Sequence, residues 1–318
     1  MTEPAHLSLS PGTRKHLGIA LMIGLVLVAA LVVFHTMNPE QMEKTLREAN
    51  PWWLVAAVGA GAVTWVGAAL PVVAFAPVPT PFRDSLLVQM ASSFAGVVAP
   101  SGLGGFAVTV RYFVKRGVQT TAAVGTLSLI EIAVFLTTLP LVLVAVLFAG
   151  LSPDLHLNFK LFLWIGLGLA VVLGGALALP QLRRWSGSQL RELWAKTKPQ
   201  LIWVSHHPKR LAVAGTGALI QTLGFIGAAG ACLAAFGHDL SLWAVGAAYL
   251  VANTLGSMIP VPGGVGSIEA SLAAALHLAG APVATAISAA VAFRLVTFYF
   301  QIPVGYVALR VLRHRQLV

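Results

Sequence analysis

Apolar residues fall into long stretches along this chain, separated by short polar gaps. A transmembrane helix needs roughly 20 consecutive, mostly apolar residues. Stretches of about this length predict six membrane-spanning helices, at about residues 17–37, 52–76, 120–149, 161–179, 211–236 and 283–309. The pattern therefore predicts an all-α, polytopic membrane protein.

Two further apolar regions, 84–110 and 241–279, are interrupted by proline and glycine. The first break runs from Pro100 to Gly105 and the second from Pro260 to Gly266. Backbone groups freed by such breaks cannot face lipid tails, so they must be buried in protein or line a wet cavity. We interpret both regions as broken, re-entrant helical hairpins, with Pro100, Pro260 and Pro262 as the structural breaks.

The basic residues predict the orientation of these segments, because Lys and Arg are enriched on the cytoplasmic side. The segment 181–210 and the C-terminal tail are both basic. Arg83 precedes the first hairpin and the cluster Arg111, Lys115 and Arg116 ends it, so both ends of that hairpin are expected inside. The loops at 237–240 and 280–282 have no Lys or Arg, which favours entry of the second hairpin from outside. We expect both termini on the cytoplasmic side of the cytoplasmic (inner) cell membrane.

The two broken regions also carry a short internal repeat. Pro100–Gly104 and Pro262–Gly266 both read P-x-G-[LV]-G, and a charged residue follows in the next span of each unit, Glu131 in the first and Arg294 in the second. Paired broken segments in an inverted-topology repeat indicate the substrate site of a transporter. The predicted units are 1–51 (first helix and interfacial segment), 52–149 (first repeat unit), 150–210 (linking helix and basic loop) and 211–318 (second repeat unit and basic tail).

Composition narrows the function. Of the 318 residues, 58% are hydrophobic and 9% are charged, whereas a soluble domain has about 25% charged residues. The net charge of +10 is concentrated in the gaps between spans, so we expect no nucleic-acid partner. The single cysteine, Cys232, allows no disulfide framework. The sequence has no H-E-x-x-H or Walker motif and no nucleophile beside a convincing base, so we expect no metal, no cofactor and no enzymatic activity.

Charged residues inside a membrane need a partner or a function, because each costs at least about 2.5–3.5 kcal/mol on insertion scales. Glu131 and Arg294 are such residues. They would form either a cavity, in which Arg294 receives an anionic headgroup while Glu131 balances the charge or carries a proton, or a structural ion pair between the two halves. Glu269 is either a favourable carboxylate in a first helical turn or a cation or proton site. Arg111 is either a phosphate ligand or a positive-inside anchor.

The glycines at the two breaks have two interpretations. Their exposed amides could cradle a phosphate, since helix N-termini attract anions. Glycine is also the residue that a sharp turn requires. The residues concerned are Gly102, Gly104, Gly105, Gly263, Gly264 and Gly266.

The segment from Ile259 to Leu309 has a recognisable order of features: P-G-G, an apolar residue and G-x-x-E, then an apolar helix, a G-x-P turn and an apolar span with a single Arg. The residues in this pattern are Pro262, Gly263, Gly264, Gly266, Glu269, Gly280, Pro282 and Arg294. The pattern resembles the flippase-like membrane-domain family, which includes the transmembrane region of lysylphosphatidylglycerol synthase. Pro100, Gly104, Arg111 and Glu131 resemble an earlier motif of that family.

The resemblance implies translocation of an aminoacylated or polyprenyl-linked anionic lipid between leaflets, without synthase activity. Membrane lipids with anionic headgroups are then the expected partners. Two other functions fit the same segments. The chain could be a secondary transporter of a small soluble solute, or a non-transporting scaffold that recruits a lipid-modifying enzyme through residues 181–210.

Overall fold

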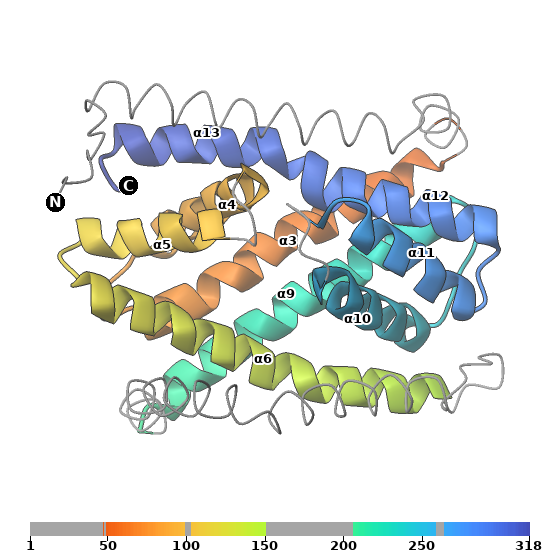
Figure 1. The fold of residues 1–318 in the computed structure, drawn as a ribbon, viewed down its shortest axis with the longest axis horizontal. Helices are drawn as coiled ribbons and strands as arrows, with labels where there is room; N and C mark the ends of the chain where they lie inside the picture. Colours follow the sequence, from red (N-terminus) through yellow and green to blue (C-terminus); the bar gives the residue numbers. More distant parts are fainter. Residues whose placement is uncertain (1–46, 48, 99–102, 151–205, 259–263) are drawn as a thin grey trace, which may run out of the picture.

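The computed structural model describes residues 47, 49–98, 103–150, 206–258 and 264–318, and every regular element in these ranges is a helix. The elements are α3 (Pro51–Phe75), α4 (Phe82–Val98), α5 (Leu103–Lys115), α6 (Thr120–Gly150), α9 (Pro208–Ala235), α10 (Leu242–Met258), α11 (Ser267–Leu278), α12 (Val283–Arg294), the π-helical turn η3 (Leu295–Tyr299) and α13 (Gln301–His314) (Figure 1).

Four stretches of helix in the described ranges are long and apolar enough to cross a membrane: Pro51–Phe75, Thr120–Thr138, Pro208–Ala235 and Val283–His314. They confirm four of the predicted spans and an all-helical, polytopic membrane protein. The predicted spans at 17–37 and 161–179, the breaks at Pro100, Pro260 and Pro262, and most of the basic loop lie outside the described residues.

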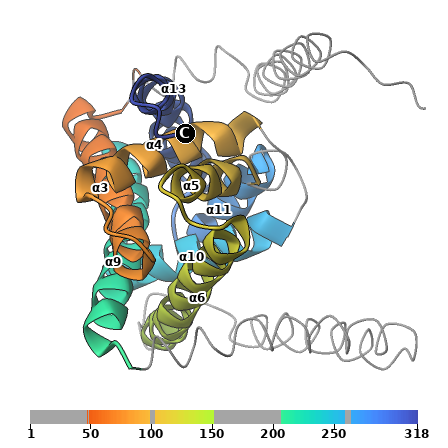
Figure 2. The same ribbon diagram turned by 90° about the vertical axis from the view of Figure 1, so that its left-hand side faces the viewer.

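Helices α3 and α9 cross and pack closely along one another, and Figure 2 shows the two together on one side of the fold. Glycine permits this approach. A Cβ atom on Gly217 would lie 2.6 Å from the Gly67 carbonyl oxygen and 2.7 Å from Pro71 Cδ. Small residues allow membrane helices to approach at backbone distance, so this crossing fixes the two helices relative to each other.

The remaining helices pack on both ends of this crossing. Helix α4 packs on α5, and α10 packs on α11. The long C-terminal helix returns along α4 through α13, whereas α6 runs along α10 (Figure 1). Each end therefore combines helices from both halves of the chain. One buried cluster includes Val88, Tyr112 and Leu312, and the other includes Cys232, Tyr249 and Phe293.

An ionic cluster holds the C-terminus to the start of α4. Arg116 Nη2 lies 2.6 Å from Asp84 Oδ2, and Arg315 Nη1 lies 3.7 Å from Asp84 Oδ1. Arg116 also donates to the carbonyl oxygen of Pro79. Asp84 thereby connects the first turn of α4 with the ends of α5 and α13.

Candidate functional site

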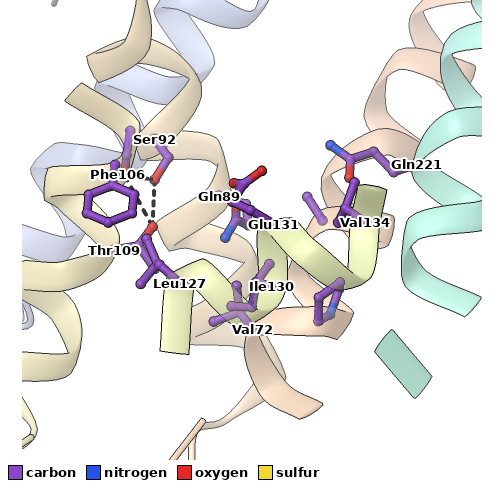
Figure 3. A pocket seen from close by; sticks show the side chains of 13 residues that line it. Val72, Gln89, Ser92, Phe106, Thr109, Leu127, Ile130, Glu131, Val134 and Gln221 are labelled. Atoms are coloured by element: carbon purple, nitrogen blue, oxygen red, sulfur yellow. Dashed lines mark hydrogen bonds between the residues drawn. The ribbon is translucent and has the colours of Figure 1, made fainter. Parts of the chain in front are cut away.

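A cavity of about 540 Å³ opens where α3, α4, α5, α6 and α9 meet. Much of its wall is apolar, with Val72, Leu127 and Val134 among its residues. Five polar side chains also line it: Gln89, Ser92, Thr109, Glu131 and Gln221. Figure 3 shows the Glu131 carboxylate in the space between α4 and α9. The cavity thus combines an apolar wall with hydrogen-bonding groups from four helices.

One wall is built by a short hydrogen-bond network between α4 and α5. Ser92 Oγ donates to the Gly105 carbonyl oxygen at 3.1 Å and lies 3.2 Å from Thr109 Oγ1. Thr109 also donates to the carbonyl oxygen of Gly105, four residues earlier. A Cβ on Gly105 would lie 2.9 Å from the Ser92 carbonyl oxygen, so glycine is needed for this contact. The network fixes the polar face that α4 and α5 present to the cavity (Figure 3).

Glu131 lies in the middle of this site on α6, within the membrane-spanning stretch Thr120–Thr138. Its side chain is exposed to the cavity. In the part of the chain that the structure describes, its carboxylate has neither a hydrogen bond nor an ion pair. An ionised carboxylate at this depth is costly without a partner, so the cavity must supply water, a proton or a ligand.

The structure corrects the expectation that Glu131 faces Arg294. Arg294 Nε donates to Glu269 Oε1 at 2.9 Å, and the two side chains are only 6% and 12% exposed. Glu269 lines a second cavity, which shares no residue with the first. The ion pair joins α11 to α12, two helices that follow one another in the chain, rather than the two halves of the chain.

Two local features position this pair. Glu269 Oε2 accepts a hydrogen bond from the Gly266 amide at 2.8 Å, which caps the start of α11. The guanidinium of Arg294 lies 4.1 Å from the centre of the Phe298 ring, where a cation–π contact is favourable. Phe298 reaches Arg294 from the π-helical turn η3. Such turns are rare and often occur at functional sites.

The other predicted site residues are dispersed. Arg111 is exposed on α5 and is not among the residues that line the first cavity. Gly104 lies inside the first turn of α5. Gly264 and Gly266 have φ values of +62° and +82°, which supports the interpretation that the break requires glycine. The Gly266 amide is occupied by Glu269. Gly102 and Gly263 lie outside the described residues.

Sequence reasoning missed five polar residues of the cavities: Gln89, Ser92, Thr109, Gln221 and Tyr299. Gln221 was detectable, because it interrupts an apolar stretch that is otherwise long enough to span a membrane. Gln89 stands in the less apolar start of a hairpin and gave a weaker signal. Nothing in the sequence distinguishes Tyr299 from an ordinary interfacial aromatic residue.

The described residues contain no group of three or more His, Cys, Asp or Glu side chains that could hold a metal ion. Among known proteins, the model of one family, described as "Lysylphosphatidylglycerol synthase TM region", matches residues 17–305. No curated protein matches the chain.

Proposed function

The chain belongs to the lysylphosphatidylglycerol synthase transmembrane-region family, and on that premise we propose that it translocates an anionic lipid, aminoacylated or polyprenyl-linked, across the cytoplasmic membrane. The barrier to such movement is the passage of a polar headgroup through hydrocarbon. A protein lowers that barrier by offering polar partners within the membrane while the acyl tails remain in lipid. Catalysis of a covalent step is not part of the proposal.

The observation that carries the proposal is the unpaired Glu131 carboxylate in a mainly apolar cavity of about 540 Å³. Gln89, Gln221 and Thr109 lie around the same space and can exchange hydrogen bonds with a headgroup. Cavities of this size and mixed lining are typical of small-ligand sites. A polar headgroup at this position would form hydrogen bonds with these side chains, which replace some of the hydrogen bonds with water that it loses on leaving the membrane surface.

Among the two lipid classes, the charge of the site favours an aminoacylated one. A carboxylate attracts the ammonium group of an aminoacyl headgroup and repels a bare phosphate. Arg294 and Glu269, the charges that line or adjoin the second cavity, neutralise each other. Glu131 would therefore receive the ammonium group, and Arg294 would receive an anion only if its pair with Glu269 opened.

The inverted repeat and the two re-entrant hairpins are part of the same proposal. Helices α4 and α10 are both 17 residues long, and α5 and α11 have 13 and 12 residues. The partners are exchanged between the units, because α13 packs on α4 and α6 packs on α10. A two-fold relation between α3–α6 and α9–α13 would give this exchange. In this arrangement the first hairpin enters from the cytoplasmic side, the second enters from outside, and both termini are cytoplasmic.

Two other functions would use the same architecture. A secondary transporter of a soluble solute would accumulate that solute without moving lipid. A scaffold would bind a lipid-modifying enzyme through residues 181–210 and move neither. We favour translocation over the scaffold, because a scaffold has no use for an unpaired intramembrane carboxylate.

The proposal is tested by reconstituting the purified protein in vesicles that contain a trace of an aminoacylated, fluorescent phospholipid. A membrane-impermeant quencher removes the fluorescence of labelled lipid in the outer leaflet. The further loss of fluorescence, as labelled lipid moves out of the inner leaflet, measures the exchange between leaflets. We expect Glu131→Gln to slow exchange at least tenfold, whereas Asp239→Asn, the same type of change at an exposed loop position, has no effect. Equal exchange rates for wild type and Glu131→Gln would remove Glu131 from the site.

A further inference from the structure

Glu131 is the one titratable side chain among the described residues that line the first cavity (Figure 3). The other polar groups of the lining, Gln89, Ser92, Thr109 and Gln221, carry amides and hydroxyls that stay neutral. Ser92 and Thr109 also donate hydrogen bonds to the backbone of α5. The charge of the cavity therefore depends on one carboxyl group and on what binds to it.

The helices around Glu131 bring no second charge into the cavity. Of the helices that pack on α6, α3 and α10 contain no charged residue. The charged residues of α4, α5 and α9 lie outside the cavity lining, at Arg83, Asp84, Arg111, Lys115, Lys209 and Arg210. The remaining titratable groups of these helices, Tyr112, Cys232 and Tyr249, lie in the two buried clusters. Within the described residues, no cation lines the cavity to compensate an ionised Glu131.

An ionised Glu131 without a cation is unfavourable at this position. The residue lies near the middle of the membrane-spanning stretch Thr120–Thr138, where a lone charge is costly. Two occupants remove this cost: a proton bound to a carboxyl oxygen, or the ammonium group of an aminoacyl headgroup. Each supplies one positive charge, so both give the same neutral site.

The two occupants exclude each other. An ammonium group binds a carboxylate through its charge and through charge-assisted hydrogen bonds, and a protonated carboxyl group has lost that charge. With both bound, the cavity would hold a net positive charge at membrane depth without an anion in its lining. The amides of Gln89 and Gln221 can serve either occupant, because an amide oxygen accepts hydrogen bonds from N–H and from O–H alike.

We propose that a proton and the headgroup ammonium occupy Glu131 in alternation, so that each aminoacylated lipid carried outward is exchanged for one proton carried inward. On the cytoplasmic side the carboxyl group gives its proton to water as the ammonium binds. On the outer side the carboxylate takes a proton from water as the ammonium leaves. One O–H bond breaks and one forms in each cycle, and no electron is transferred. The inference rests on the proposed function and adds its energy source, the proton gradient across the membrane.

The first test measures binding without transport. The full-length protein in detergent is titrated with fluorescent lysyl-phosphatidylglycerol, whose lysine side-chain ammonium stays charged below about pH 10. Because one proton competes with the headgroup, the apparent Kd should rise by up to about tenfold for each unit by which the pH is lowered. Glu131→Gln should bind weakly, with a Kd that does not depend on pH. Asp239→Asn, at an exposed loop position, should behave like the wild type.

The second test measures the coupling itself. Vesicles that contain the protein and the same lipid are prepared with an interior one pH unit more alkaline than the external buffer, and a membrane-impermeant quencher reports the leaflet distribution. One-for-one exchange converts this tenfold proton gradient into enrichment of the lipid, by up to about tenfold, in the leaflet on the acidic side. This direction is the same for both orientations of the protein in the vesicle. Protein-free vesicles and vesicles with Glu131→Gln should show no enrichment.

A wild-type Kd that is independent of pH, or an even lipid distribution under the gradient despite rapid exchange, would overturn the inference. A pH-dependent Kd that persists in Glu131→Gln would assign the proton to another group and would overturn it as well. Failure of the inference can be distinguished from failure of the proposed function. Rapid exchange without enrichment rejects only proton exchange, whereas a pH-dependent Kd without lipid exchange supports alternate occupancy of Glu131 and rejects translocation.

Discussion

Neutralising Glu269 tests the role of the buried ion pair. Glu269→Gln keeps the size of the side chain and an oxygen that can accept from the Gly266 amide, but it leaves the Arg294 charge without its carboxylate. Arg294 is 6% exposed at the side chain, so water cannot replace that partner. Removing one member of a buried pair costs about 3–5 kcal/mol.

Part of that cost is offset by the Phe298 ring, 4.1 Å from the guanidinium, because a cation–π contact contributes about 0.5–2 kcal/mol. We therefore expect Glu269→Gln to lower the free energy of unfolding by about 2–4 kcal/mol. Each kcal/mol shifts Tm by about 2–4 °C in chains of 150–250 residues, and longer chains shift less. At about 2 °C per kcal/mol for this chain of 318 residues, Tm should fall by roughly 4–8 °C.

The assay is thermal unfolding of the purified protein in detergent, followed by size-exclusion chromatography after heating. The double variant Glu269→Gln/Arg294→Gln should be more stable than Arg294→Gln or Glu269→Gln alone, because it removes both charges of the pair together. Asp239→Asn serves as the control. A Tm for Glu269→Gln within 1–2 °C of wild type, or additive losses in the double variant, would refute this account of the pair.

Three further predictions concern the packing, the ionic cluster and the topology. Gly217→Ala should lower Tm, because its Cβ would meet Gly67 and Pro71 at 2.6–2.7 Å and overpacking costs about 1–3 kcal/mol. Gly59→Ala is the control, because the space around its Cβ is open. Equal Tm values for the two variants would contradict a close α3–α9 crossing. Asp84→Asn should lower the free energy of unfolding by about 1–3 kcal/mol, because it weakens the ionic contacts with Arg116 and Arg315. Urea unfolding in detergent measures this change, and an unchanged urea midpoint would show that the ionic cluster contributes nothing to stability. Lys115 and Asp239 are both exposed. In a Cys232→Ala background, a membrane-impermeant maleimide added to intact cells should label Asp239→Cys but not Lys115→Cys. Labelling of both variants would contradict oppositely inserted hairpins.

Much of the helical framework could be predicted from hydropathy alone. The predicted spans 52–76 and 211–236 correspond to Pro51–Phe75 and Pro208–Ala235, because a membrane helix must be long and apolar whatever its neighbours are. The broken regions correspond to the pairs α4–α5 and α10–α11. The π-helical turn η3 was not predicted, because hydropathy does not distinguish a π-helical turn from an α-helical one.

The candidate site was harder to predict, because hydropathy does not determine which helices are neighbours. The sequence identified Glu131, Glu269 and Arg294 as the charges that need an explanation. Their partners follow from tertiary packing: α11 lies against α12, so Glu269 reaches Arg294, whereas Glu131 faces a cavity that α4 and α9 help to line. The predicted repeat was the reason for connecting Glu131 with Arg294, whereas the structure pairs Arg294 with Glu269.

The central claim, lipid translocation, is tested most directly by the wild-type protein alone in vesicles. The measurement compares two labelled phospholipids that differ only in an aminoacyl group on the headgroup, and follows their exchange between leaflets. The account predicts that the purified protein accelerates exchange of the aminoacylated lipid and accelerates exchange of the unmodified lipid much less. Exchange of the aminoacylated lipid at the rate of protein-free vesicles would contradict it.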